Sequence, residues 1–220
     1  VDRRAFRVQD IDNLSGKLLR IDALTGEGLP SNPYYEGDAS ANRAKVYQLG
    51  YRNPWRLSVD ASSGRVFIGD VGWSTWEEIN SGDVPGANQG WPFFEGGSGQ
   101  SLVQMNGYAN TVEGREFFAQ ENPEDKVVAP IYALNHQADG INAIVLGAKL
   151  NSGYYGEDFQ GDLFLNDLGK GTVRHVSFDA SGNVESVGVF ANDAQYFVKI
   201  AEGPDGALYY CALIGNRVGR

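Results

Sequence analysis

The sequence predicts an all-β fold of the β-propeller type, built from short strands joined by tight turns. The 220 residues include 29 glycines and 12% aromatic residues, a composition that suits strands and turns better than helices. A phrase of strand, Asp, a few residues, Gly and strand also recurs, in RIDALTGEGL, SVDASSGRVFI, SFDASGNVESV and GPDGALYY. Because such an Asp bonds back to the main chain and the Gly adopts positive φ, each copy predicts a strand-turn-strand unit.

The spacing of this phrase favours a propeller over other antiparallel folds. Its first two aspartates, Asp22 and Asp60, lie 38 residues apart, and repeats of about 40 to 45 residues are typical of propeller blades. Strand-turn-strand phrases also occur in other antiparallel proteins, which stay open at this point. One short helix is expected over 113–123, ended by Pro123. Strands are expected over 17–23, 56–61, 65–71, 162–167, 172–180, 184–191, 197–202 and 207–213.

Charge and composition exclude several classes of partner. The formal net charge is −10, with 18 Lys and Arg against 28 Asp and Glu, which argues against a nucleic-acid surface and against binding to anionic membranes. No apolar run reaches the length of a membrane-spanning helix, so no membrane insertion is expected. The single cysteine, Cys211, lies in the apolar run ALYYCALI and is expected to be a buried core thiol.

Residues 50–80 hold the densest set of candidate site residues. Arg52 and Asn53 precede Pro54, which favours an extended backbone at the start of a strand. An arginine there can bind a carboxylate or phosphate of a ligand through two parallel bonds, or can pair with a carboxylate of the protein to fix the loop. The residues alone leave both interpretations open.

A second group follows in DVGWSTWEEIN. Asp70, Glu77 and Glu78 are three carboxylates within nine residues, and Gly72 can bring its main-chain oxygen close to a metal. Solvated charges at a sheet edge are the other interpretation. The two histidines, His136 and His175, are not placed with metal-ligating spacing, so zinc is not expected.

Taken in order, several strings resemble the soluble glucose/sorbosone dehydrogenase family. They are QDIDNLSGKLLRID (9–22), GYRNPWRLSVD (50–60), GDVGWSTWEEIN (69–80) and GANQGWP (86–92), with FQGDLFLNDLGKGTVRHVSFD (159–179) and IAEGPDGALYY (200–210) further on. Members of this family are quinoprotein aldose sugar dehydrogenases that use pyrroloquinoline quinone (PQQ) and Ca²⁺ on a six-bladed propeller. The resemblance therefore implies this fold and this chemistry for the chain.

The resemblance also implies roles for particular residues. Arg52 and Asn53 would bind the PQQ carboxylates and quinone oxygens, and Lys170 of DLGKG would place a cation near PQQ. The main-chain oxygens of Gly72 and Trp73 would bind the Ca²⁺ that polarises PQQ. Glu78 would tie the loop or contribute to a second Ca²⁺ site.

Three departures from the family pattern bear on activity. The family's catalytic base is a histidine expected ahead of Gln9, so no catalytic residue is assigned within the chain. Trp55 stands where glucose-type members have a glutamine, and HQADGIN lacks their lysine, so glucose specificity is not implied. A six-bladed propeller needs roughly 240 to 270 residues. Residues 1–220 are therefore expected to form one partial propeller domain of about three to four blades, the C-terminal part of a longer protein.

Two functional hypotheses follow. The first is PQQ- and Ca²⁺-dependent oxidation of an aldose sugar to its lactone by the parent protein, with an unknown electron acceptor and with this chain alone inactive. The second is a non-catalytic extracellular propeller that binds carbohydrate or a partner protein through loops containing Trp55, Trp73, Trp76 and Trp91. The resemblance implies an extracytoplasmic location, periplasmic or secreted, in either case.

Overall fold

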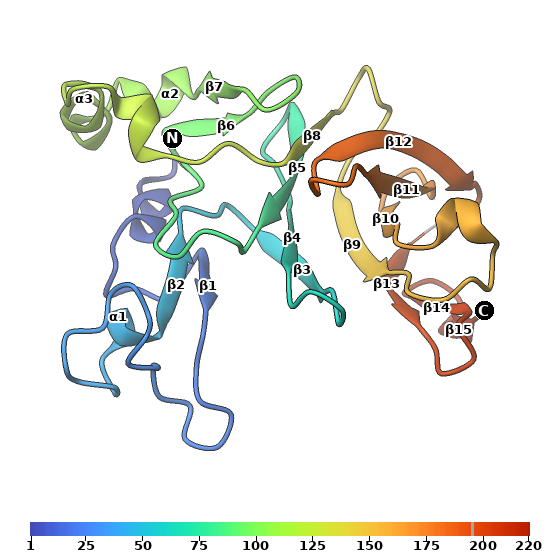
Figure 1. Cartoon of the computed structure of the whole chain (residues 1–220). Helices are drawn as coiled ribbons and strands as arrows, with labels where there is room; N and C mark the ends of the chain where they lie inside the picture. The colour runs from blue at the N-terminus through green and yellow to red at the C-terminus, as the bar shows by residue number, and fades with distance from the viewer. Residues whose placement is uncertain (195) are drawn as a thin grey trace.

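The computed structural model describes residues 1–194 and 196–220 and consists mainly of antiparallel strands. They form two four-stranded sheets, one three-stranded sheet and two two-stranded sheets. Figure 1 shows these sheets following one another without closing into a ring. The expected all-β, incomplete propeller is therefore confirmed.

The first four-stranded sheet contains most of the candidate site residues. Its strands, in spatial order, are β3 (Pro54–Val59), β4 (Val66–Asp70), β5 (Trp76–Ser81) and β8 (Tyr132–Asn135). The predicted Asp-Gly turn joins β3 to β4. Asp60 accepts hydrogen bonds from the Ser62 amide through its side chain (3.0 Å) and from the Gly64 amide through its carbonyl (2.7 Å), and Gly64 has φ +76°.

The second four-stranded sheet repeats this plan. It consists of β9 (Ile144–Lys149), β10 (Leu163–Asp167), β11 (Val173–Phe178) and β12 (Val184–Ala191). The turn between β11 and β12 is the predicted one, because the Asp179 side chain accepts from the amides of Ser181 and Asn183, each at 2.9 Å.

The remaining strands flank these two sheets. The three-stranded sheet is β13 (Phe197–Glu202), β14 (Leu208–Ala212) and β15 (Arg217–Gly219). The hairpins are β1 (Lys17–Leu19) with β2 (Val46–Leu49), and β6 (Phe94–Gly96) with β7 (Leu102–Gln104). Of the leading strands, β9 packs against both β3 and β13, as the inner strands of successive propeller blades do.

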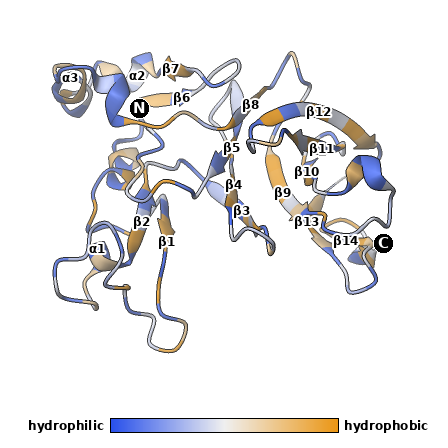
Figure 2. Ribbon diagram, viewed as in Figure 1, coloured by the Kyte–Doolittle hydropathy of each residue, from blue (hydrophilic) through white to orange (hydrophobic). Residues whose placement is uncertain are grey.

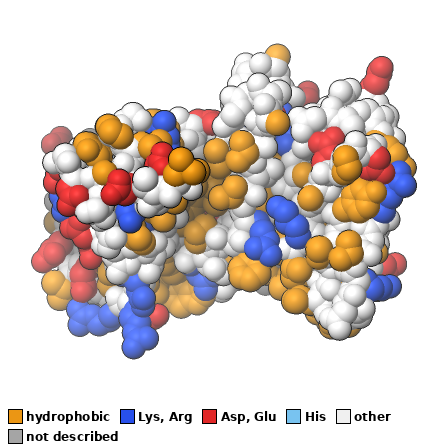
Figure 3. Space-filling model, turned by 90° about the horizontal axis from the view of Figure 1, so that it is seen from below, with side chains coloured by type: hydrophobic (Ala, Val, Ile, Leu, Met, Phe, Trp, Pro, Cys, Tyr) orange, Lys and Arg blue, Asp and Glu red, His pale blue; other side chains and the backbone are white. Residues whose placement is uncertain are grey.

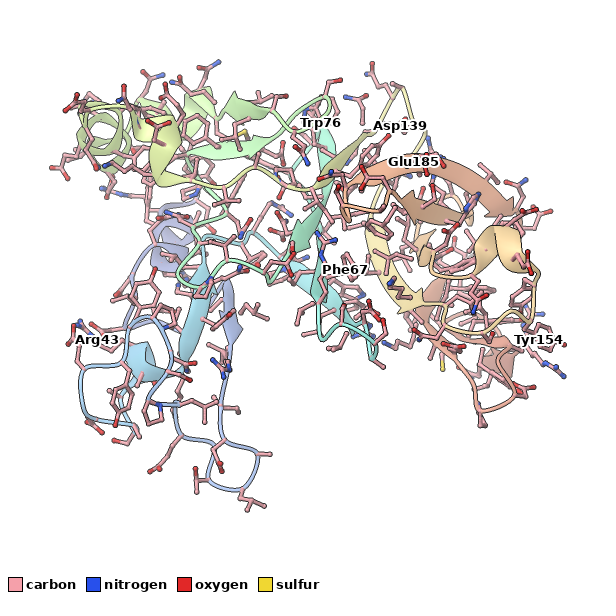
Figure 4. All side chains as sticks on the ribbon, in the orientation of Figure 1. Arg43, Phe67, Trp76, Asp139, Tyr154 and Glu185 are labelled. Carbon is pink, nitrogen blue, oxygen red and sulfur yellow. The ribbon has the colours of Figure 1, made fainter. Side chains whose placement is uncertain are left out.

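A continuous apolar core joins the two four-stranded sheets. Phe67 is labelled between them in Figure 4, and β9, which reads IVLGAK, begins with an apolar run that is coloured hydrophobic in Figure 2. Burial of such side chains contributes about 1.5–3 kcal/mol each relative to exposure, which holds the two sheets as neighbours. The core residues are Phe67, Ile79, Leu134, Ile141, Ile144, Leu146, Leu163, Leu165 and Val176.

The helical segments are short. The predicted helix over 113–123 is found as α3 (Val112–Phe118), which begins after Thr111, whose hydroxyl accepts from the Gly114 amide at 3.0 Å. It ends five residues before Pro123, which instead begins a 3₁₀ turn, η2 (Pro123–Lys126). The other helices are α1 (Asn42–Lys45), α2 (Asn106–Ala109), η1 (Arg3–Val8) and η3 (Glu157–Phe159).

Two further features differ from expectation. Cys211 is exposed rather than buried, because it occupies an outward position of β14 within the run that had suggested a core strand. The EEIN stretch is part of the strand β5, and residues 132–135 form β8 beside it, although neither strand was expected. Among the described residues, no helix is both long and apolar enough to cross a membrane.

Candidate functional site

The candidate site begins where the chain enters β3. Asp70, the last residue of the neighbouring strand β4, is buried, and its two carboxylate oxygens accept from the amides of Arg52 (2.8 Å) and Asn53 (2.6 Å). The backbone of the Arg-Asn-Pro segment is therefore fixed by a side chain from the next strand. Sequence reasoning had considered Asp70 as a metal ligand, and the structure shows that its oxygens bind these two amides.

The Arg52 side chain is held in turn. Its Nη1 donates to the Val71 carbonyl at 2.7 Å, and its guanidinium carbon lies 5.5 Å from the ring centroid of Trp91. Among the described residues it pairs with no carboxylate in a salt bridge. Of the two interpretations that the sequence left open, pairing with a protein carboxylate is therefore not what the structure shows.

Arg52 and Asn53 line a cavity of about 360 Å³. Trp91 forms another part of its wall, and the side opposite β3 comes from η1 and the residues that follow it. Sequence reasoning missed the contribution of η1, because its arginines lie more than 40 residues ahead of Arg52. The lining residues are Asp2, Arg4, Ala5, Arg7, Val8, Ser15, Gly16, Arg52, Asn53 and Trp91.

The proposed Ca²⁺ loop lies beside this cavity. Gly72 has no room for a side chain, because a Cβ there would overlap the carbonyl of Trp76 and lie 3.0 Å from Glu95 Oε1. The Trp73 amide donates to the same Glu95 oxygen at 2.6 Å. Among the described residues, no hydrogen bond reaches the main-chain oxygens of Gly72 and Trp73. Two such oxygens fit a hard cation such as Ca²⁺.

Three buried carboxylates lie behind this loop. Asp70, Glu78 and Glu95 line one small cavity together with Arg52, and the Gln89 side-chain nitrogen that lines it is buried without a hydrogen-bond partner. Burial raises the pKa of Glu95 and, with the nearby Glu78 charge, raises the pKa of Asp70 well above its usual range. The site therefore combines one guanidinium with an excess of buried acid.

Glu78 has the role of a tie between segments. One carboxylate oxygen accepts from the Gly96 amide at 2.6 Å and the other from the Asn80 side chain at 3.0 Å. Burial raises the pKa of Glu78 to about 7. Among the described residues no three His, Cys, Asp or Glu side chains are grouped so as to hold a metal. Glu78 thus ties β5 to β6, and its predicted part in a second Ca²⁺ site remains a prediction.

Each of the two histidines contacts a different carboxylate, His136 that of Glu77 and His175 that of Asp162. Glu77 is fully buried, accepts from the Ile144 amide at 2.9 Å, and contacts His136 Nε2 at 2.7 Å. His175 Nδ1 lies 2.6 Å from a carboxylate oxygen of Asp162. Neither histidine lines the Arg52 cavity, and the expectation that neither has the role of the family's base remains a prediction.

Lys170 lies outside the cavity that Arg52 and Asn53 line. It is exposed in the turn after β10, with its ammonium group near Gly140, and it does not line the cavity that Arg52 and Asn53 share. The structure therefore brings together Arg52, Asn53, Gly72, Trp73 and Glu78, while the predicted role of Lys170 remains a prediction.

Together, fold and site define an incomplete β-propeller with an arginine-lined cavity beside a loop that offers main-chain oxygens. A family model described as Glucose / Sorbosone dehydrogenase matches residues 2–212. The chain therefore belongs to the glucose/sorbosone dehydrogenase family.

Known proteins agree with this assignment. The aldose sugar dehydrogenase YliI of Escherichia coli (strain K12) is 27% identical over 209 residues, which cover 91% of this chain and 49% of that relative. A solved structure of an oxidoreductase (glucose dehydrogenase) from Thermus thermophilus is 26% identical with a TM-score of 0.67, covering 96% of this chain and 52% of that one.

The PQQ-bound aldose sugar dehydrogenase from Streptomyces coelicolor shares the fold. It has a TM-score of 0.64 at 21% identity, covering 94% of this chain and 49% of that one. The chain thus spans about half the length of the relatives it matches.

Proposed function

We propose that this chain forms the cofactor-binding part of a PQQ- and Ca²⁺-dependent dehydrogenase that oxidises an aldose sugar to its lactone. The proposal rests on one observation above all. Arg52 and Asn53 face a cavity with their backbone fixed by Asp70, and the guanidinium forms no salt bridge among the described residues. Membership of the glucose/sorbosone dehydrogenase family supports the reaction class.

The residues present suit both groups. PQQ carries carboxylates, which match the planar fork of Arg52, and its oxygens can accept from the Asn53 amide side chain. The main-chain oxygens of Gly72 and Trp73 would hold Ca²⁺, and Lys170 would add a cation from the turn after β10. When bound, PQQ accepts hydride from the anomeric carbon, and Ca²⁺ acts as a Lewis acid.

This chain's own residues would mainly bind and orient. Asp70 keeps the Arg-Asn-Pro backbone in place. Trp91 stacks on the Arg52 guanidinium and so limits the directions in which its remaining N–H donors can point. Glu95 fixes the Trp73 amide and thereby the direction of the loop oxygens. The proton of the sugar hydroxyl would pass to the histidine that the family places ahead of Gln9. We also propose an extracytoplasmic location, on the basis of the family resemblance.

A PQQ titration of the full-length parent protein with Ca²⁺ tests the proposal. Cofactor absorbance measures PQQ binding, and dye reduction with a panel of aldoses measures turnover. Arg52→Ala removes charge-assisted bonds of roughly 1.5–3 kcal/mol, so the Kd for PQQ should rise about 10- to 100-fold. Arg56→Ala is the matched control. Arg56 lies four residues further on, and its Nε donates to the Val198 carbonyl at 2.9 Å, away from the cavity. No saturable PQQ binding by a folded, Ca²⁺-loaded parent protein would contradict the proposal.

One observation favours the alternative of a non-catalytic propeller that binds carbohydrate or a protein. Trp55, Leu57 and Val59 alternate along β3 and are 44%, 48% and 54% exposed. Figure 3 shows hydrophobic side chains along the hollowed middle of the lower face. Exposed aromatic faces can stack on sugar rings. Sugar binding that persists without PQQ and falls in Trp55→Ala would favour this alternative.

A further inference from the structure

Three arginines converge on the cavity that Arg52 and Asn53 line. Arg4 and Arg7 come from η1, Arg52 comes from the segment before β3, and the only carboxylate among the lining residues is that of Asp2. The chain as a whole carries a net charge of −10. The lining of this cavity is therefore net positive on an acidic protein, which favours an anionic ligand. The buried carboxylates of Asp70, Glu78 and Glu95 line the neighbouring small cavity that also contacts Arg52, so Arg4 and Arg7 are the lining cations that lie clear of this acid.

The fold holds η1 against the cavity. Arg7 Nε donates to the Arg4 carbonyl at 2.9 Å, and the Asp2 side chain accepts from the Arg4 amide at 2.9 Å. The end of η1 is fixed by Lys17, whose buried ammonium donates to the Val8 carbonyl at 2.6 Å. The two arginines are thus attached to a segment with a defined position rather than to a free terminus.

The pairing of the η1 arginines separates them into two kinds. Arg3 forms a salt bridge with Glu113 at 2.8 Å. Among the residues that the structure describes, no carboxylate lies within salt-bridge distance of the guanidinium groups of Arg4 or Arg7. Arg4, Arg7 and Arg52 therefore all retain donors for a ligand in the cavity, whereas Arg3 is already paired outside it.

We propose that Arg4 and Arg7 join Arg52 in binding the carboxylates of a small organic anion in this cavity. Guanidinium groups bind carboxylates through two parallel hydrogen bonds, and three of them around about 360 Å³ suit a molecule with one or more carboxylates. Two sources share this chemistry: the carboxylates of PQQ and the carboxylate of an acidic sugar. The first source deepens the proposed function and rests on it, whereas the second does not.

Titrations of the unchanged chain and its variants with PQQ and with D-glucuronate test this proposal. Quenching of tryptophan fluorescence is a suitable readout, because Trp91 lines the cavity. Arg4→Ala and Arg7→Ala should each weaken binding about three- to tenfold at low ionic strength, and less at high salt because both side chains are exposed. Arg3→Ala is the matched control and should change the affinity by less than about twofold, because Arg3 is already paired with Glu113.

The outcomes separate this proposal from the proposed function. Loss of PQQ affinity in Arg4→Ala and Arg7→Ala supports both, with the cofactor as ligand. Arginine-dependent binding of glucuronate without PQQ binding supports the cavity and contradicts the proposed function. If PQQ binds and only Arg52→Ala weakens it, the proposed function stands and the role of Arg4 and Arg7 is refuted. Failure of both probes to bind the unchanged chain overturns the proposal for the cavity.

Discussion

The two four-stranded sheets use the same anchor at the start of their leading strands but place different side chains on it. In the first sheet, Asp70 at the end of β4 accepts from the amides of residues 52 and 53, just before β3. In the second, Asp167 at the end of β10 accepts from the amides of Asn142 (3.1 Å) and Ala143 (3.2 Å), just before β9. The anchor is thus a feature of the blade, and the arginine is what the first blade adds.

The third strands differ as well. In register, Glu78 of β5 lies opposite Asp70, whereas Thr172, just before β11, lies opposite Asp167, and its carbonyl accepts from the Asp167 amide at 3.0 Å. The first sheet therefore collects buried acid around its anchor, and the second sheet has an uncharged threonine at the comparable position. The difference shows that a repeated backbone plan can carry a cluster of buried acids in one blade and an uncharged residue in the next.

Removal of the two anchors should give the largest difference between the sheets. Asp70→Ala leaves two amides without their acceptor, and Asp167→Ala leaves three, since Asp167 also accepts from the Gly169 amide at 2.9 Å. Each change should lower the free energy of unfolding by about 2–4 kcal/mol. Asp70→Ala should also raise the Kd for PQQ at least about tenfold, because it frees Arg52 and Asn53 together. Urea unfolding and PQQ titration measure the two effects. An equal loss of PQQ affinity in Asp167→Ala would contradict the comparison.

The buried acid of the first sheet should appear in the pH dependence of stability. The pKa of Glu78 is raised by burial from 4.5 to about 7. The folded state therefore holds this proton more tightly than the unfolded state does. The contribution of Glu78 to stability is greatest below pH 4.5 and is lost as the pH rises to about 7. Glu78→Gln should remove this loss and stabilise the chain by about 1–3 kcal/mol at pH 8.

Glutamine can keep one of the hydrogen bonds that Glu78 makes and replace the other by one of opposite direction. Its oxygen can still accept from the Gly96 amide, and the Asn80 side-chain oxygen, which is buried without a partner, can accept from the new amide group. Thermal unfolding between pH 5 and pH 8 measures the effect. A variant whose stability falls with pH as steeply as that of the unchanged chain would show that Glu78 is not the group responsible.

The smallest expected effect concerns the opposite end of the two sheets. Lys149 of β9 pairs with Asp60 after β3 at 2.7 Å, and both belong to a cleft of about 560 Å³ between the sheets. Lys149→Met should lower the free energy of unfolding by about 1 kcal/mol, because the Lys149 side chain is part exposed and Asp60 keeps its serine partners. PQQ affinity should not change, which calorimetry and titration can check together.

The sequence predicts what is local in this fold and misses what the chain brings together from a distance. The Asp-Gly turns at 60–64 and 179–183 and the strands around them are encoded by neighbouring residues. Glu95, which holds the Trp73 amide, lies 22 residues away from it, and Arg4 meets Arg52 only because η1 packs across the segment before β3. No periodicity signals such contacts, since they depend on how hairpins pack.

The family resemblance predicted some of the residues that local sequence patterns do not indicate. It indicated Arg52 and Asn53 as neighbours of the cofactor, and the structure places them on one cavity. It also indicated Lys170, which the structure places in an exposed turn near Gly140 and away from that cavity. Cys211 shows a case in which a local pattern was misleading. The apolar run predicted burial, whereas strand alternation turns that one side chain outward.

The aspartate anchors have a consequence for protein design. Each anchor accepts only from main-chain amides, so the aspartate can hold its loop whichever side chains precede the leading strand. In the first blade the Arg52 side chain adds a bond of its own to the Val71 carbonyl. Recognition groups at these two positions can therefore be exchanged in one blade, or copied from one blade into another, while the aspartate anchor is kept.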